Sequence, residues 1–219
     1  MTAVNKAYDI LRAGIIEGTY PPGSRVTEQE IALASGVSRT PVREAMGKLQ
    51  AEGLLQVLPH QGAVVRTWSD SDAEEIFELR ALLEAYTVQR AAENASADEL
   101  SELRRVAEDQ HAEVGEKNPG YLERIADIND RFHKLLQKAA GSERLKALLA
   151  TLSEAPLVFE TFRDYSDEEL ERSARHHVEI VQALECGDQR WAASVMCAHV
   201  LAARTTFRRM RSSDDQSNQ

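Results

Sequence analysis

The sequence predicts a mainly α protein in which a small helix-and-hairpin module precedes an all-α antiparallel helical bundle. Two observations support this. A capped helix, a glycine turn, a second helix and a β-hairpin follow one another in residues 27–66. From Ser69 onward, apolar residues recur at helical spacing and no segment has the pattern of a strand. The 219 residues suffice for two domains, which we place at 1–67 and 68–211, with a polar, flexible tail at 212–219.

The two N-terminal helices are marked by their caps. Thr27 and Glu30 have the spacing of a capping box, in which each side chain accepts a hydrogen bond from the other's backbone N–H. Gly36 suits the left-handed backbone of a tight turn between helices. Ser38 can cap the second helix, and Pro41 falls in its first turn, where a missing N–H costs nothing. The pattern predicts two closely crossing helices.

The hairpin and the start of the second helix suggest nucleic-acid binding. Two β-prone runs, 54–58 and 63–66, flank a turn that contains His60 and Gly62. Such a hairpin beside two crossed helices acts as a wing whose tip can touch the DNA backbone or minor groove. The exposed start of the second helix suits insertion into a major groove; its residues are Ser38, Arg39, Thr40 and Arg43. The alternative is an ordinary helical hairpin with surface arginines.

The segments 25–32 and 36–45, preceded by 15–23, resemble the DNA-binding domain of GntR-family transcription regulators. The resemblance extends over residues 1–67 and implies a winged helix-turn-helix that binds double-stranded DNA. It also implies a set of DNA-contacting residues: Gln29, Ser38, Arg39, Thr40 and Arg43, with His60 and Gly62 at the wing tip.

The charge is divided unequally along the chain. Residues 1–67 hold seven Lys or Arg and six Asp or Glu, a balance of +1, whereas the remainder holds nineteen and thirty, a balance of −11, which together give the net charge of −10. A nearly neutral DNA-binding part with arginines at one helix tip is expected to depend on paired half-sites, and therefore on a homodimer.

Cellular location is predicted from two absences in the sequence. Cys186 and Cys197 form no disulfide framework in a chain of this length. No signal-peptide pattern begins the sequence, and no apolar run approaches the roughly 20 residues of a membrane span. We therefore expect a cytoplasmic protein without membrane association.

The second part is expected to form a six- or seven-helix antiparallel bundle. Its first helix begins near Ser69 and has an apolar stripe made of Ile76, Leu79, Leu83 and Tyr86. Further helices are predicted at 97–116, 120–139, 142–162, 167–186 and 188–211.

Three histidines lie within the apolar stripes of three different helices. His133 shares a helix face with Asn129, four residues earlier. His177 lies ten residues before Gly187 and His199 twelve after it, at heights of roughly 15 and 18 Å on neighbouring antiparallel helices. Three imidazoles and a carboxamide oxygen suit a divalent metal with positions left for water or a ligand. The alternative is that these are hydrogen-bonded core histidines.

The order and spacing of these residues resemble the metal-binding set of the FCD domain, the all-helical effector domain of one GntR branch. The set is Asn129, His133, His177 and His199. In that family the first ligand is commonly aspartate and sometimes asparagine. The resemblance implies a divalent metal ion, with zinc as first choice and nickel and manganese as alternatives.

Arg80 is the candidate effector-binding residue. It is in phase with Ile76 and Leu83 on the first bundle helix, so it is expected to point partly inward, where a guanidinium requires an anion. The alternative is a surface pair with Glu84, four residues later. In the FCD family, an arginine at this position lines the effector cavity and binds an organic acid.

These features predict a transcription regulator that is not an enzyme. Two chains would present two helices to a palindromic operator, and a small carboxylate held by Arg80 would modulate operator affinity. One alternative is a metal-dependent helical enzyme acting on a small carboxylate, with Asp130 or Glu179 as the base beside the metal. Another is a purely structural metal in a helical part that only dimerises.

Overall fold

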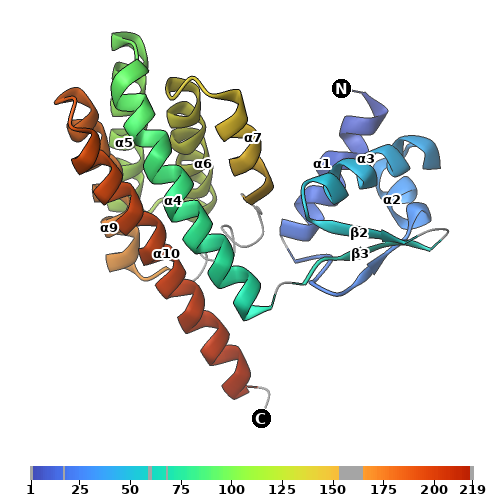
Figure 1. Ribbon diagram of the computed structural model, residues 1–219. Coiled ribbons are helices and arrows are strands. Elements are labelled where there is room, and N and C mark those ends of the chain that lie inside the picture. The colour runs from blue at the N-terminus through green and yellow to red at the C-terminus, as the bar shows by residue number, and fades with distance from the viewer. Residues whose placement is uncertain (1, 17, 59–60, 68, 153–164, 218–219) are drawn as a thin grey trace. The chain divides into compact units, whose positions relative to one another are not determined.

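The computed structural model describes residues 2–16, 18–58, 61–67, 69–152 and 165–217, which form two compact units (Figure 1). The first unit extends to Ala73 and the second begins at Glu74. Helices dominate the described residues, so the mainly α class is confirmed. None of the helices in these ranges is both long and apolar enough to cross a membrane.

The first unit packs three helices onto one face of a small antiparallel sheet (Figure 1). The strand order is β1-β3-β2. Leu11, Ile31 and Leu49, one from each helix, are fully buried in a core shared with the sheet. The elements are α1 (Ala3–Ile16), β1 (Arg25–Val26), α2 (Glu28–Ser35), α3 (Arg39–Ala51), β2 (Leu55–Leu58) and β3 (Gly62–Val65).

The predicted caps are confirmed at α2 and only partly at α3. Glu30 N donates to Thr27 Oγ1 at 3.2 Å, and Thr27 N donates to Glu30 Oε2 at 2.7 Å. Gly36 ends α2 with φ of 65°, in the left-handed region that glycine tolerates. Ser38 occupies the N-cap position of α3, but its side chain makes no capping hydrogen bond. That part of the prediction is wrong, since the exposed Ser38 hydroxyl accepts no hydrogen bond from the first turn of α3.

The wing contains a strand that the sequence did not reveal. The two-residue strand β1 pairs with β3, and it is too short to display any periodicity. At Gly62, φ is 86°, and an added Cβ would lie 2.4 Å from the carbonyl oxygen of Val26. Gly62 is therefore needed for the close approach of β3 to β1. His60, predicted at the wing tip, lies outside the described residues.

The second unit is helical throughout its described part. Helix α5 packs against α6 and α9, and α9 packs against α10. Tight turns at Gly120, Gly141 and Gly187 have positive φ and separate successive helices. The helices are α4 (Asp70–Asn94), α5 (Ala97–Glu116), α6 (Tyr121–Ala139), α7 (Glu143–Leu152), α9 (Asp167–Glu185) and α10 (Gln189–Ser217).

The predicted helix bounds agree closely, with one clear difference. Helix α10 continues to Ser217, although the sequence predicted a flexible tail from 212. Residues 212–217 are polar but contain neither proline nor glycine, so nothing in them ends the helix. The end of the helix predicted at 142–162 lies outside the described residues beyond Leu152.

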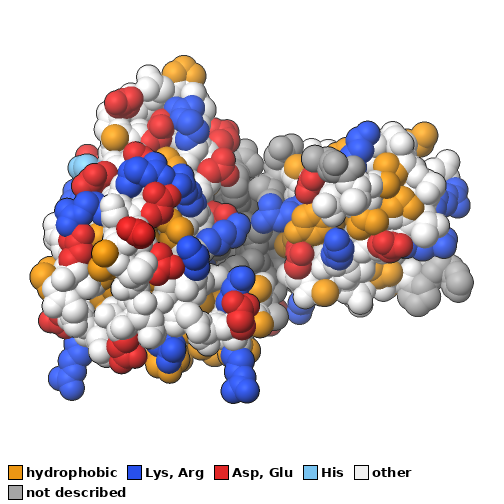
Figure 2. Space-filling view, turned by 90° about the horizontal axis from the view of Figure 1, so that it is seen from above, with side chains coloured by type: hydrophobic (Ala, Val, Ile, Leu, Met, Phe, Trp, Pro, Cys, Tyr) orange, Lys and Arg blue, Asp and Glu red, His pale blue; other side chains and the backbone are white. Residues whose placement is uncertain are grey.

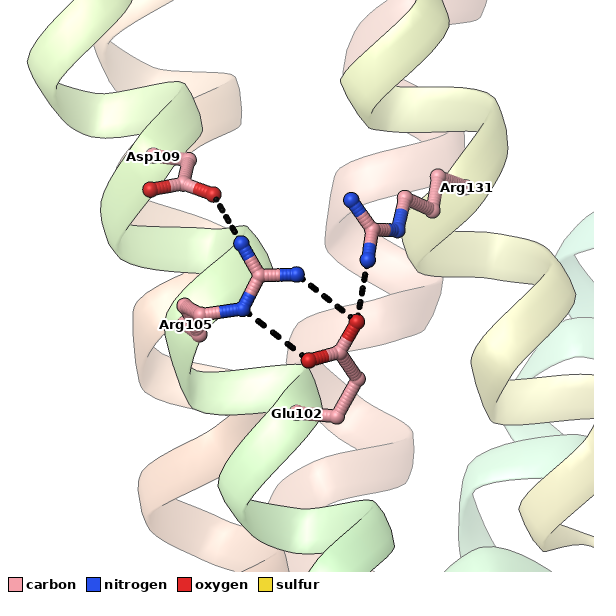
Figure 3. Close-up of polar contacts among 4 residues, drawn as sticks. All are labelled: Glu102, Arg105, Asp109 and Arg131. Atoms are coloured by element: carbon pink, nitrogen blue, oxygen red, sulfur yellow. Dashed lines mark hydrogen bonds and ion pairs between the residues drawn. The ribbon is translucent and has the colours of Figure 1, made fainter.

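An exposed network of charges joins α5 to α6 (Figure 3). Arg105 of α5 contacts Glu102 at 2.8 Å and Asp109 at 2.9 Å, while Arg131 of α6 reaches the same Glu102. On the face of the second unit that Figure 2 shows, acidic and basic side chains are interspersed in the same way. Exposed pairs of this kind contribute little individually, so the bundle depends mainly on its apolar core.

The buried face of α4 differs from the predicted stripe. Ile76 is buried, but Leu79 and Tyr86 are 39% and 50% exposed, and neighbouring Leu82 is 69% exposed. The prediction of a core stripe was wrong for Leu79 and Tyr86 because α4 has apolar residues on two sides. The residues that face the core are Ala73, Phe77, Ala81, Val88 and Ala91. An apolar strip therefore remains exposed on α4.

Glu169 ties the start of α9 to the end of α10. It forms a capping box with Ser166, and its Oε1 accepts hydrogen bonds from Thr206 Oγ1 at 2.8 Å and Arg209 Nη1 at 2.9 Å. Burial alone would raise the pKa of Glu169, but these donors outweigh burial and lower the pKa to about 2. The carboxylate is therefore charged throughout the neutral range.

We expect Glu169→Gln to destabilise the protein in a pH-dependent way. The pKa of about 2 lies below the ordinary value of 4.5. The carboxylate therefore stabilises the fold above pH 4.5, and this contribution is lost as the pH falls toward 2. Urea unfolding should show a loss of about 1–2 kcal/mol at pH 7, allowing for the half-exposed Arg209, and less than half of that at pH 3. Glu168→Gln, an exposed neighbour, is the control; equal losses at both pH values for Glu169→Gln would contradict this assignment.

Candidate functional sites

The starts of α2 and α3 form one exposed polar surface. Arg39 Nη2 donates to Gln29 Oε1 at 3.3 Å, which joins the two helices. The structure thus brings Gln29 next to the predicted residues of α3. Those α3 residues are all exposed: Ser38, Arg39, Thr40 and Arg43.

Glu28 is a member of this surface that the sequence reasoning missed. Its Oε1 accepts a hydrogen bond from Arg43 Nε at 2.5 Å, and this bond raises the pKa of the Arg43 guanidinium. Arg43 is therefore held in place while its side chain remains 65% exposed. The only sequence signal for the pair is the acidic first turn of α2, because the two residues lie 15 positions apart.

An arginine also lies close to the turn of the wing. Arg25 of β1 donates through Nε and Nη2 to the carbonyl oxygen of Gln61, at 2.9 and 2.7 Å. Beside it, Gly62 is occupied in strand packing. The structure supplies this packing role for Gly62, and the predicted DNA contacts of Gly62 and His60 stay predictions.

Three histidines from three helices converge inside the second unit. His133 of α6, His177 of α9 and His199 of α10 each place a ring nitrogen within 4.8 Å of the others. The ring centroids of His177 and His199 are 4.6 Å apart, as their matched heights on either side of the turn at Gly187 predicted. His177 is fully buried and His199 nearly so, with 8% exposure.

Two of the rings are held from behind by polar side chains. Gln110 Oε1 lies 2.5 Å from Nδ1 of His177, and Glu84 Oε2 lies 2.5 Å from Nδ1 of His133. The amide and carboxylate oxygens are hydrogen-bond acceptors, so their close approach favours the tautomer with the hydrogen on Nδ1 in both rings; the Glu84 contact has the distance of an ion pair. Nε2 of each ring then keeps its lone pair and points into the cluster.

Four buried polar atoms, one on Asn129 and one on each of the three histidines, have no hydrogen-bond partner among the described residues, and Asn129 lies one helical turn before His133 on α6. They are Asn129 Oδ1, His133 Nε2, His177 Nε2 and His199 Nδ1. Unsatisfied buried polar atoms are costly, and each costs about 1–3 kcal/mol. One oxygen and three nitrogens are a suitable donor set for a divalent metal, whose bonds to nitrogen are about 2.0–2.1 Å long. Small side-chain rotations would bring the nitrogens to such distances.

The protonation states of His177 and His199 also favour metal binding. Burial, together with the neighbouring imidazoles, lowers the pKa of both His177 and His199 well below the ordinary value. These rings are neutral near pH 7, which is the form that binds a metal. Phe132 stacks on His177 with centroids 4.0 Å apart and closes one side of that ring to water.

Arg80 lies beside the cluster and is 7% exposed. Its Nε and Nη2 donate to Glu84 Oε1 at 3.0 and 2.8 Å. The i,i+4 pair with Glu84 exists, but it is buried rather than on the surface. Burial alone would raise the pKa of Glu84, yet His133 and Arg80 outweigh burial and hold the pKa below its ordinary value. Glu84 therefore remains an anion between two partners.

The structure also gives the surroundings of three residues near the histidines in sequence or on the same helices. His176, expected to be solvated, is half-buried, and its ring lies 5.9 Å from that of His199. Asp130 is exposed and pairs with Lys134 at 2.5 Å. Glu179 accepts a hydrogen bond from Trp191 Nε1 at 2.8 Å. Both carboxylates that were considered as the base in the enzyme alternative thus have other partners.

Comparisons with known families match both units. Residues 3–65 match the family described as bacterial regulatory proteins, gntR family, and residues 75–202 match the FCD domain. A probable D-xylose utilization operon transcriptional repressor of Paenarthrobacter nicotinovorans is 32% identical over 210 residues, 92% of this chain and 87% of that protein. The Nta operon transcriptional regulator of Aminobacter aminovorans is 30% identical over 181 residues, 83% of each chain.

Solved structures share the fold. Escherichia coli McbR/YncC superposes with a TM-score of 0.80 at 21% identity, covering 96% of this chain and 99% of that chain. A putative transcriptional regulator GntR from Rhodococcus sp. RHA1 has a TM-score of 0.71 at 23% identity, covering 94% and 98%. At these identities the likeness extends to the fold alone.

Proposed function

Because the chain belongs to the GntR family of DNA-binding bacterial transcription regulators and has an FCD domain, we propose that a small organic acid, bound with a divalent metal in the helical unit, controls its operator affinity. The observation that carries this proposal is the set of four unpartnered donor atoms on Asn129, His133, His177 and His199. Arg80 and His133 contact the same carboxylate, that of Glu84. A site for a metal and a site for an acid are therefore adjacent.

DNA recognition is assigned to the exposed starts of α2 and α3. Arg39 and Arg43 offer guanidinium groups that can contact guanine edges or phosphates. The wing tip, with His60 and Gly62, is placed at the adjacent backbone or minor groove. A homodimer in the cytoplasm would present two such surfaces to the half-sites of a palindromic operator. The remaining contacts are assigned to Gln29, Ser38 and Thr40.

Arg39→Ala and Arg43→Ala should each weaken operator binding by about tenfold or more, because a specific guanidinium contact contributes about 1–3 kcal/mol. Gel shifts would use duplexes that the parent protein selects from a random pool, at one fixed salt concentration. Lys48→Ala, at the exposed opposite end of α3, is the matched control. Parent-like affinity in both arginine variants would show that another surface reads the DNA.

The charge of the site favours an anionic effector. Asn129 and the neutral imidazoles of His177 and His199 contribute no charge, a metal-bound imidazole of His133 would add none, and Arg80 and Glu84 cancel one another. A divalent ion would therefore leave a net buried charge of about +2, which is costly without a compensating anion. A carboxylate meets this need, because it can occupy an open metal position and accept hydrogen bonds from Arg80. Zinc suits the nitrogen-rich donor set, with nickel and manganese as alternatives.

Removal of one histidine should remove the metal. We expect one divalent ion per chain in the purified parent protein and less than one-tenth of that in His177→Ala, measured by elemental analysis after dialysis. His111→Ala, an exposed histidine of α5, is the control and should keep its ion. The thermal shift on adding Zn²⁺ should be absent in His177→Ala alone. Equal metal content in the two variants would exclude the histidine cluster as the site.

An acid screen tests the effector part. Metal-loaded protein should gain thermal stability with some members of a panel of small carboxylic acids, and the same acids should change operator affinity. Chelation of the metal should abolish this response. Unfolding on chelation, with no response to any acid, would instead support a structural metal.

The exposed apolar strip of α4 is proposed as the dimer contact. Leu79, Leu82 and Tyr86 lie within two turns of one another on the solvent side of the helix. Exposed apolar side chains gathered in this way are typical of a covered interface.

Leu82→Glu should convert the dimer to a monomer, because it places a charge within an apolar contact. Light scattering during gel filtration would measure the mass, and operator affinity should fall in parallel. Leu148→Glu, which alters another exposed leucine, on α7, is the control. A dimer that persists in Leu82→Glu would place the interface elsewhere.

A further inference from the structure

One carboxylate serves both candidate sites of the helical unit. Glu84 Oε1 accepts two hydrogen bonds from Arg80, and Glu84 Oε2 lies 2.5 Å from Nδ1 of His133. The Glu84 side chain is 6% exposed, so water does not screen either contact effectively. A change in one partner must therefore act on the other.

The polar groups that contact Nδ1 of His177 and of His133 differ in charge. His177 is held by the neutral amide of Gln110, whereas His133 is held by an anion. A carboxylate behind a metal-binding imidazole fixes its tautomer and orientation and makes its free nitrogen a better donor. Since Asn129 adds no negative charge, Glu84 is the anion that most directly supports a cation at this cluster.

We propose that Glu84 is a positioning residue that couples occupancy of the histidine cluster to the state of Arg80. This inference rests on the proposed function. A cation on Nε2 of His133 draws electron density from the ring and strengthens the contact between Nδ1–H and Glu84. The carboxylate is then held more firmly, and Arg80 with it, in the geometry that receives an acid. By reciprocity, an acid that pulls on Arg80 changes the affinity for the cation.

Zn²⁺ alone is the probe, titrated into full-length metal-free protein against a competing chelator. We expect Glu84→Gln to raise the Kd for Zn²⁺ by about 10- to 100-fold, as loss of such supporting contacts typically does. Glu84→Asp keeps the charge on a shorter side chain and should give an intermediate value. Glu78→Gln, on the exposed side of the same helix, should leave the Kd unchanged. An unchanged Kd in Glu84→Gln would overturn the proposal.

A double-mutant cycle separates coupling through Glu84 from direct repulsion between Arg80 and the ion. Arg80→Gln should change the Kd for Zn²⁺ by about threefold or more when Glu84 is present, and not at all in the Glu84→Gln background. The same change in both backgrounds would mean that Arg80 acts on the ion directly, and the proposal would be wrong. Far-UV circular dichroism checks that each variant is folded.

The unsubstituted protein provides an independent measurement. In metal-free protein with ¹⁵N-labelled histidine, the His133 ring, identified by its absence in His133→Gln, should carry its proton on Nδ1. A proton on Nε2 would overturn the proposal whether or not any variant folds. No acid is used, so failure of the effector screen does not affect these results. If Zn²⁺ does not bind the parent protein, the metal part of the proposed function fails first and this inference fails with it.

Discussion

The ion pair between Arg80 and Glu84 sets the electrostatic conditions of the helical unit. Two charges removed from water cost several kcal/mol each unless they find partners, so neither residue can be changed alone without leaving the other uncompensated. The pair lies on one helix, α4, and through Glu84 it reaches His133 on α6. The polar contacts of the interior thus form one connected chain that ends at four atoms with no partner of their own among the described residues.

The proposed DNA-binding surface depends on exposed rather than buried polar contacts. Its arginines are exposed, and each is oriented by a neighbour at the start of α2: Arg39 by Gln29 and Arg43 by Glu28. Solvent-exposed ion pairs and hydrogen bonds are weak, so they orient the arginine side chains but can be exchanged for a stronger contact. A phosphate or a guanine edge offers such a contact. The helical unit has unpartnered polar atoms in its interior, whereas the winged unit has exposed arginines that are held by weak contacts on its surface.

The sequence predicted the features that depend on neighbours along the chain. The capping box at Thr27, the glycine turn at Gly36 and helix bounds such as 97–116 follow from residues within a few positions, and the histidines could be aligned by counting from Gly187. Contacts between distant segments could not be found in this way. Gln110 lies 67 residues from its partner His177 and has no distinguishing pattern. The orientation of α4 was mistaken because apolar side chains occupy two of its faces, and only the packed bundle decides which face is covered.

The glycine at position 62 limits how this wing can contribute to the choice of operator. Because an added Cβ would collide with the backbone of β1, the position has no side chain with which to distinguish one base pair from another. Any contact made there comes from the peptide backbone, so it cannot be altered by exchanging a side chain. Differences in operator preference between this regulator and its relatives must therefore be encoded in residues other than Gly62, for which the start of α3 is the proposed location. Comparing the residue at this position between wings would therefore not predict which base pair the wing prefers.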